Sequence, residues 1–85
     1  MMIIFKYPLN LGITELRIPY AAILLDVQMQ GDTPMLWAQV DPQGIPRTLR
    51  IHCVGTGQEV PKHSIHLSTV QHEALVWHFF AEGWL

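Results

Sequence analysis

The chain has 85 residues, enough for one domain but not for two, since each half would be too short to bury a core. Hydrophobic residues make up 49% of the sequence and charged residues only 14%, which excludes an intrinsically disordered chain. The formal net charge of −2 excludes a protein that binds nucleic acid through bulk electrostatic attraction. We therefore expect a single domain over residues 1–85. Its excess of apolar side chains predicts a homo-oligomer, a two-fold dimer or higher.

The N-terminal segment and the single cysteine bear on localisation. Residues 1–8 lack the basic region, the long apolar region and the small-residue cleavage site of a signal peptide. The longest apolar run, residues 21–25, has the length of a strand and is too short to span a bilayer. Cys53 is the one cysteine, so the fold does not depend on an internal disulfide. We expect a cytoplasmic protein without a membrane partner.

Alternation with a period of two residues predicts strands in the first half of the chain. A first strand is expected over residues 3–7, before Pro8, and a second over residues 14–18. The segments 22–30 and 35–40 flank the turn residues Gly31-Asp32-Thr33-Pro34 and read as a hairpin. In the first arm of this hairpin, alternation places four apolar residues on one face: Ile23, Leu25, Val27 and Met29.

The second half of the chain continues the same pattern. A turn at Asp41-Pro42-Gln43-Gly44 precedes a strand over residues 47–54, and residues 64–70 and 74–81 form a final hairpin. Residues 69–82 could compete as a helix, but their central aromatic and β-branched residues favour a strand. The predicted fold is all-β, a small antiparallel meander of about six or seven short strands that forms a compact sandwich or half-barrel.

The strand faces opposite the apolar ones collect amide, imidazole, guanidinium, hydroxyl and indole side chains with almost no carboxylate. Such a set suits a polar or anionic molecule that carries an aromatic ring. The alternative is an ordinary solvated sheet face with Trp37 half-buried. The residues that we expect to bind the ligand are Trp37, Gln39, Arg47, Arg50, His52, His66 and His78.

Motifs for catalysis or metal binding are weak. His63-x-x-His66 with His52 or His78 could supply metal ligands, but His63 and His66 would face opposite sides of a strand, so we expect no metal site. Cys53 falls on an apolar face and is expected to pack in the core. Gly55-Thr56-Gly57 has backbone N–H groups that could cradle a phosphate, although it lacks the lysine and helix of a P-loop. We expect neither an enzyme nor a cofactor.

Five short motifs carry a resemblance to a family of small proteins encoded by bacteriophages and prophages. They are Lys6-Tyr7-Pro8-Leu9 (KYPL), residues 27–30 (VQxQ), residues 36–42 (LWAxVDP), residues 55–57 (GTG) and residues 75–80 (LVxHxF). The resemblance covers residues 6–80 and implies phage origin and action in the host cytoplasm. Short phage proteins of this kind are often inhibitors of host defence, which is an argument from analogy.

Two functions follow as expectations. In the first, the protein is an oligomer that sequesters a small anionic nucleotide-type signal in pockets at its subunit interface. In the second, it inhibits a host defence protein through an exposed surface such as Trp84-Leu85 or the Trp37 face. A minor role in virion structure or assembly is a further alternative. Trp84 and Leu85 are also expected either at the dimer interface or folded back on the core of their own subunit.

Overall fold

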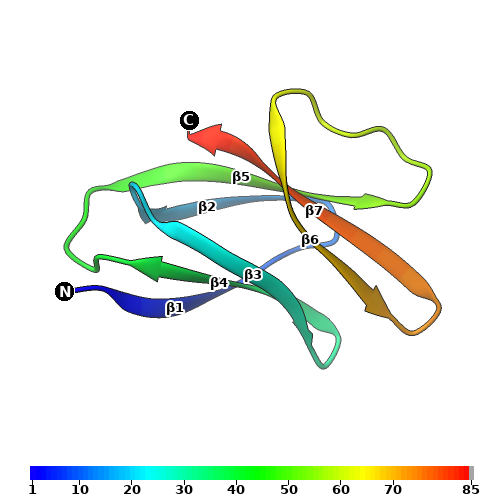
Figure 1. Ribbon diagram of the computed structural model, residues 1–85, viewed down its shortest axis with the longest axis horizontal. Coiled ribbons are helices and arrows are strands. Elements are labelled where there is room, and N and C mark those ends of the chain that lie inside the picture. The colour runs from blue at the N-terminus through cyan, green and yellow to red at the C-terminus, as the bar shows by residue number, and fades with distance from the viewer. Residues whose placement is uncertain (85) are drawn as a thin grey trace.

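The computed structural model describes residues 1–84, except for the side chain of Trp84, and shows seven strands in two sheets (Figure 1). The strands are β1 (Ile3–Pro8), β2 (Ile13–Pro19), β3 (Ile23–Gln30), β4 (Thr33–Val40), β5 (Pro46–Gly55), β6 (Ser64–His72) and β7 (Leu75–Trp84). No helix occurs in residues 1–84, and so none that could cross a membrane. The predicted all-β fold is confirmed. The expected contacts of the Trp84 side chain and of Leu85 lie outside the described structure.

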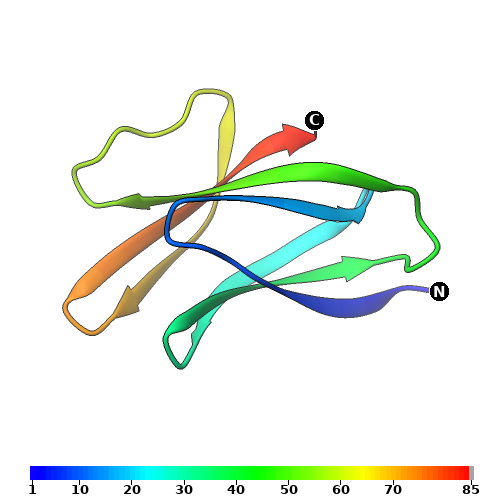
Figure 2. The same cartoon turned by 180° about the vertical axis from the view of Figure 1, so that it is seen from behind.

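The two sheets have the strand orders β1-β4-β3 and β2-β5-β7-β6, and every pair is antiparallel. We call them sheet A and sheet B. Only β3–β4 and β6–β7 join as hairpins, whereas the other three pairs connect strands that are distant in sequence. The tips of both hairpins lie at the same end of the molecule in Figures 1 and 2. The chain therefore departs from a simple meander outside these two hairpins.

The core lies between the sheets, where apolar residues of alternate strand positions meet. Among the most enclosed are Phe79, Ile18, Leu36, Ile51 and Val27, each less than 2% exposed. Burying one such side chain contributes roughly 1.5–3 kcal/mol relative to leaving it in water. On β2, β4, β5 and β7 every second residue near this core is apolar and points inward. The opposite positions of the same strands consequently form the two outer faces of the sandwich.

Beta-bulges interrupt the alternation of β3 and β6. The pairing of β3 with β4 shifts at Leu25, so Ile23 pairs with Gln39 on the outer face while Leu24 and Val27 turn inward. Ile23 and Leu25 are consequently exposed, and their predicted place on the face of Val27 is wrong. A bulge inserts one extra residue and reverses the alternation beyond it, which explains the error.

The bulge in β6 has the same effect on a polar residue. Register shifts between His66 and Ser68, so Ser68 pairs with Phe79 on the inner side. Its hydroxyl donates a hydrogen bond of 3.1 Å to the carbonyl of Val27 in the other sheet. Unbroken alternation along β6 would place Ser68 on the outer face with His66, and the bulge turns it inward instead.

Candidate functional site

Three histidines surround Phe80 on the outer face of sheet B. In the strand register, Phe80 of β7 pairs with His52 of β5 on one side and with His66 of β6 on the other. His78 lies two residues earlier on β7 and therefore points to the same face. We call these four residues, His52, His66, His78 and Phe80, the histidine face. Alternation in β5 and β7 brings them together, because their neighbours Cys53, Phe79 and Trp77 point to the core.

Hydrogen bonds link two of these histidines through threonine hydroxyls. Thr69 Oγ1 lies 2.8 Å from His66 Nε2 and 3.0 Å from His78 Nδ1. The second nitrogen of His78, Nε2, lies 3.0 Å from Thr56 Oγ1. A neutral imidazole donates from one nitrogen and accepts at the other, and hydroxyls can serve both roles. The ring of His66 also meets Phe80 edge-on, with centroids 5.3 Å apart. The side chains of this face are thus held in fixed orientations.

A pocket of about 230 Å³ opens where the histidine face meets the turn after β5. Its lining combines apolar and polar side chains with the backbone of the turn: Val54, Gly55, Thr56, Gly57, Gln58, Val60, His78 and Phe80. The turn is closed by Gln58, whose N–H donates to the Gly55 carbonyl at 3.0 Å and whose Oε1 accepts from the Gly55 N–H at 2.7 Å. Gly57 has a φ of 91°, a conformation that favours glycine, and its N–H donates to no atom of the described residues. Its N–H is therefore available to a ligand.

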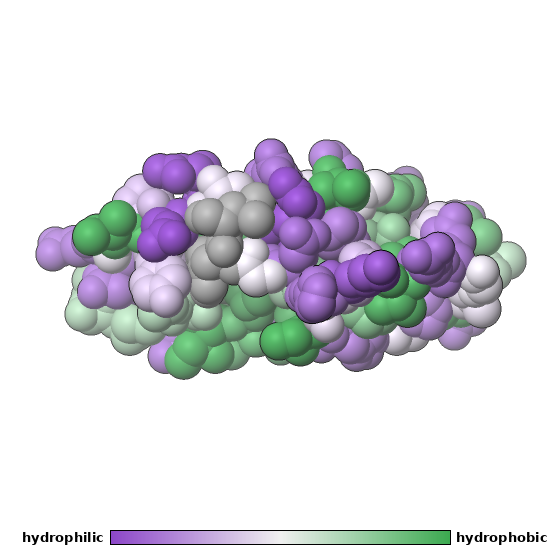
Figure 3. Space-filling view, turned by 90° about the horizontal axis from the view of Figure 1, so that it is seen from above, coloured by the Kyte–Doolittle hydropathy of each residue, from purple (hydrophilic) through white to green (hydrophobic). Residues whose placement is uncertain are grey.

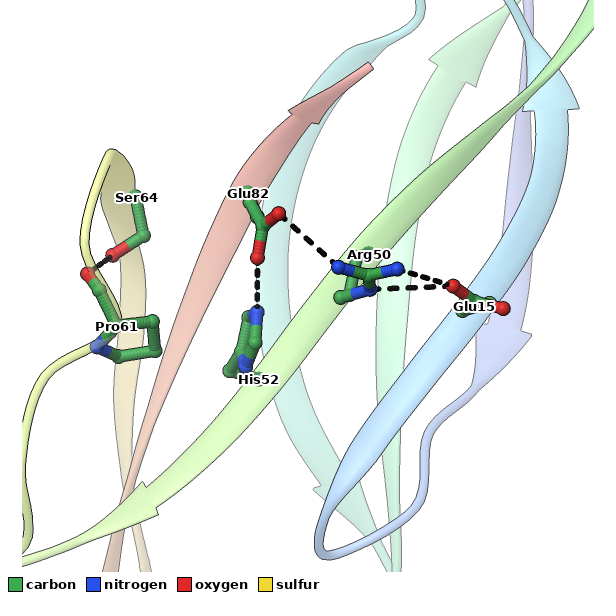
Figure 4. Close-up of polar contacts among 6 residues, drawn as sticks. All are labelled: Glu15, Arg50, His52, Pro61, Ser64 and Glu82. Atoms are coloured by element: carbon green, nitrogen blue, oxygen red, sulfur yellow. Dashed lines mark hydrogen bonds and ion pairs between the residues drawn. The ribbon is translucent and has the colours of Figure 1, made fainter. Parts of the chain in front are cut away.

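An ionic chain occupies the other end of the same outer face (Figure 4). Arg50 Nη2 lies 2.8 Å from Glu15 Oε2, and Arg50 Nη1 lies 3.2 Å from Glu82 Oε2. Glu82 Oε1 lies 2.9 Å from His52 Nε2. The hydrogen bond from His52, with a further contribution from Arg50, lowers the pKa of Glu82. Arg50 is thus already neutralised by two carboxylates, and an anionic ligand would have to displace them.

The long loop between β5 and β6 is fastened next to this chain. Ser64 Oγ donates a hydrogen bond of 2.6 Å to the carbonyl of Pro61 (Figure 4). Ser64 also pairs with Glu82 in the register of β6 and β7. The contact fixes the end of the loop that carries Val60, one of the apolar residues of the pocket.

The structure divides the seven expected ligand-binding residues among three places. Arg50, His52, His66 and His78 share the outer face of sheet B, as the positions of their strands require. Trp37 and Gln39 lie on β4 and face outward from sheet A, on the opposite side of the sandwich. Arg47 lies at the start of β5, where its guanidinium is 5.3 Å from the ring centroid of Tyr20. One subunit therefore cannot join Trp37 and Arg50 in a single pocket.

The sequence reading missed several residues of this site. Phe80 and Gln58 line the pocket, and Glu15 and Glu82 hold Arg50. For Phe80 a signal existed, because it shares a strand face with His78. For the two carboxylates the sequence held no signal. Strand pairing brings them to Arg50, although Glu15 is 35 positions and Glu82 is 32 positions away from it in sequence.

Potential metal ligands lie elsewhere, at the tips of the two hairpins. Asp32, His72 and Glu73 place their donor atoms within 4.8 Å of one another, the one such group of three in the described part of the chain. His72 Nε2 and Asp32 Oδ1 are 3.0 Å apart and so already satisfy each other. His63 and His66, the pair considered from sequence, do not belong to this group.

Cys53 faces the core of the sandwich. It pairs with Phe79 and packs against the buried cluster between the sheets. Burial raises the pKa of its thiol, which disfavours the thiolate that a nucleophile requires. The expected role of Cys53 in packing therefore agrees with its position.

Comparison with known proteins gives one match. A family model described as a domain of unknown function (DUF7352) matches residues 1–83. No curated protein and no solved structure matches the chain.

Proposed function

The chain belongs to the DUF7352 family of domains of unknown function, and within this fold we propose a non-catalytic binding protein that sequesters a small nucleotide-type ligand. The observation that carries the proposal is the pocket in which the Gly55-Thr56-Gly57 turn meets His78 and Phe80. It combines an aromatic ring, a threonine hydroxyl held by the imidazole of His78 and an available backbone N–H in one small space.

The lining of the pocket matches the two parts of such a ligand. Val54, Val60 and Phe80 offer an apolar wall for a planar base, and stacking on an aromatic side chain contributes about 1–3 kcal/mol per base. The Thr56 hydroxyl, which His78 holds in place, and the N–H of Gly57 offer partners for phosphate or carbonyl oxygens. Pockets for drug-sized ligands are usually about 300–1,000 Å³, so this one holds a single base or phosphate group and leaves the rest on the histidine face.

The charges on this face favour one orientation of the proposed ligand. Glu15 and Glu82 outnumber Arg50 at the end of the face away from the turn, which makes that end unfavourable for a phosphate. The turn end holds His78, Thr56 and Gly57 and no carboxylate within the pocket lining. The phosphate therefore lies at the turn and the remaining apolar part extends toward Phe80 and His66.

A role in binding fits the state of the reactive groups better than catalysis does. Glu82 and Glu15 are engaged by Arg50, and the Cys53 thiol is directed to the core. The resemblance to small phage proteins supports a wider role in which the captured ligand is a nucleotide signal of host defence. Sequestration needs only affinity and protein concentration, and no chemical step.

A thermal-shift panel of cyclic dinucleotides, cyclic ADP-ribose isomers and linear nucleotides tests the proposal. Ligand at 100 times Kd adds about 2.7 kcal/mol to the free energy of unfolding. For a domain of this size the melting temperature should then rise by about 10 °C or more. His78→Ala and Phe80→Ala should abolish most of the shift. Arg47→Ala, which removes a cation outside the pocket, should leave it unchanged.

Two results would overturn the proposal. If no nucleotide shifts the melting temperature, inhibition of a host protein becomes the better hypothesis. If a nucleotide binds and the His78 and Phe80 variants bind it equally well, the pocket is not the site. Sheet content by circular dichroism shows that each variant is folded.

A further inference from the structure

The outer face of sheet A carries apolar and charged residues in an ordered pattern. Gln39 of β4 pairs with Ile4 of β1 on one side and with Ile23 of β3 on the other. In the next row Trp37 pairs with Lys6 on the β1 side and with Asp26 on the β3 side. We call these six residues, Ile4, Lys6, Ile23, Asp26, Trp37 and Gln39, the Trp37 face. One row has an isoleucine at each end, and the other has opposite charges at its ends.

The apolar part of this face is open to solvent. Ile4 is 61% exposed and Ile23 is 53% exposed, and the bulge beside them leaves Leu25 47% exposed. Figure 3 looks from above onto the opposite side of the molecule, over sheet B, where polar residues lie among the apolar ones. Large exposed apolar side chains beside charged and amide groups are typical of a protein interface.

Both charged residues are held by uncharged groups of their own subunit. Lys6 Nζ donates to Gln30 Oε1 at 2.8 Å, and Gln28 Nε2 donates to Asp26 Oδ2 at 2.8 Å. The backbone N–H of Val27 also donates to Asp26 Oδ1, at 2.8 Å. Within the described chain neither Lys6 nor Asp26 forms an ion pair. Each keeps its full charge for a partner.

We propose that the Trp37 face binds a second copy of the chain about a two-fold axis that runs parallel to β4. This axis places β1 of one copy over β3 of the other, so Lys6 meets Asp26 of the partner subunit, twice by symmetry. The same operation sets Ile4 opposite the partner's Ile23 and brings the two Trp37 side chains to the centre. Sheets that pack face to face keep their strands within about 30° of each other, which this axis respects.

The alternative two-fold axis across the strands fails on charge. With this axis through the row of Trp37, β1 would lie over β1, so Lys6 would face the partner's Lys6 and Asp26 would face the partner's Asp26. Like charges brought together at an interface are unfavourable. The opposite signs at the two ends of one row thus select the axis along β4. The pocket on sheet B lies on the other side of the sandwich, so this inference does not depend on the proposed ligand.

Charge reversal tests the inference. Light scattering coupled to gel filtration should show a dimer for the wild-type chain at 100 µM. Lys6→Glu and Asp26→Lys should each shift the protein to monomer, because each creates two repulsive pairs. The double variant Lys6→Glu/Asp26→Lys should recover the dimer, since every pair is again attractive. An equimolar mixture of the two single variants should also form a dimer, which shows that both are folded.

A matched control and three outcomes complete the experiment. Arg17→Glu makes the same charge change on the outer face of sheet B and should leave the dimer intact. A monomeric wild-type chain overturns the proposal. So does a dimer that resists both single reversals. Loss of the dimer in the double variant would exclude the axis along β4.

Discussion

His52 and Glu82 meet diagonally across β5 and β7, with Nε2 of the imidazole 2.9 Å from Oε1 of the carboxylate. The other carboxylate oxygen of Glu82 lies 3.2 Å from Arg50 Nη1. Both contacts favour the ionised carboxylate, and the hydrogen bond from His52 is the larger cause of the lowered pKa of Glu82. Glu82 therefore links a cation of the ionic chain to the histidine face.

This link makes stability depend on pH in the acid range. The pKa of Glu82 is lower in the folded chain than its unfolded value of about 4.3, so its contribution is complete above that pH. It is lost as the pH falls through the folded pKa. In urea unfolding between about pH 5 and pH 3, Glu82→Gln should therefore flatten the loss of stability seen in the wild type. Glu59→Gln, a change in the exposed loop, should retain the wild-type slope, and an unchanged slope for Glu82→Gln would contradict the assignment.

A second prediction concerns the bridge between the two sheets. The Ser68 hydroxyl donates to the Val27 carbonyl at 3.1 Å, and Val27 is fully buried. Ser68→Ala leaves that carbonyl without this donor and should lower the free energy of unfolding by about 1 kcal/mol. Asp32→Ala removes the exposed contact with His72 between the same two hairpins and should change stability by less than about 0.5 kcal/mol. If both substitutions lower the free energy of unfolding equally in chemical denaturation, the Ser68 hydrogen bond stabilises the fold no more than the exposed contact does.

Backbone conformation provides a third prediction, at the turn between β6 and β7. Glu73 has a φ of 55°, in the left-handed region that costs a non-glycine residue about 1–2 kcal/mol. Glu73→Gly should raise the stability by about 0.5–1 kcal/mol, because glycine adopts this φ without strain but loses more entropy on folding. The melting temperature should rise by several degrees. Ala74→Gly, in the same turn without a positive φ, should lower it, and a fall in both variants would rule out strain at Glu73.

How far sequence reading succeeds depends on whether alternation is unbroken. On β5 and β7 it is unbroken at the site, so the outward positions of His52 and His78 could be predicted residue by residue. On β3 it fails at Leu25, because a bulged leucine is no different in composition from the leucine before it. Local pattern determines the face of a side chain only between bulges.

Which side chains meet at the site could not be predicted, because the sequence does not show which distant strands pair. Trp37 and Arg50 both alternate outward, but they belong to different sheets, which depends on pairing between distant strands. The carboxylates that neutralise Arg50 come from β2 and β7 for the same reason. The turn at Gly55-Thr56-Gly57 was recognisable from its glycines, whereas its contact with His78 and Phe80 was not.

The bulge at Leu25 supplies the last prediction. Leu24 pairs with Ala38, and Asp26 pairs with the next residue, Trp37. Removal of Leu25 therefore leaves a regular ladder in which Leu24 still points inward and Asp26 still points outward. The variant lacking Leu25 should therefore fold, with a cooperative thermal transition. Removal of Gln28 gives a chain of the same length as the Leu25 deletion, but it shifts Val27 to the outer face and turns Asp26 inward. This change loses about 1.5–3 kcal/mol of apolar burial and also buries a charge. That variant should show no cooperative transition. Equal stability of the two deletion variants would mean that the hairpin can slip its register, and that the bulge does not fix which residues reach the core.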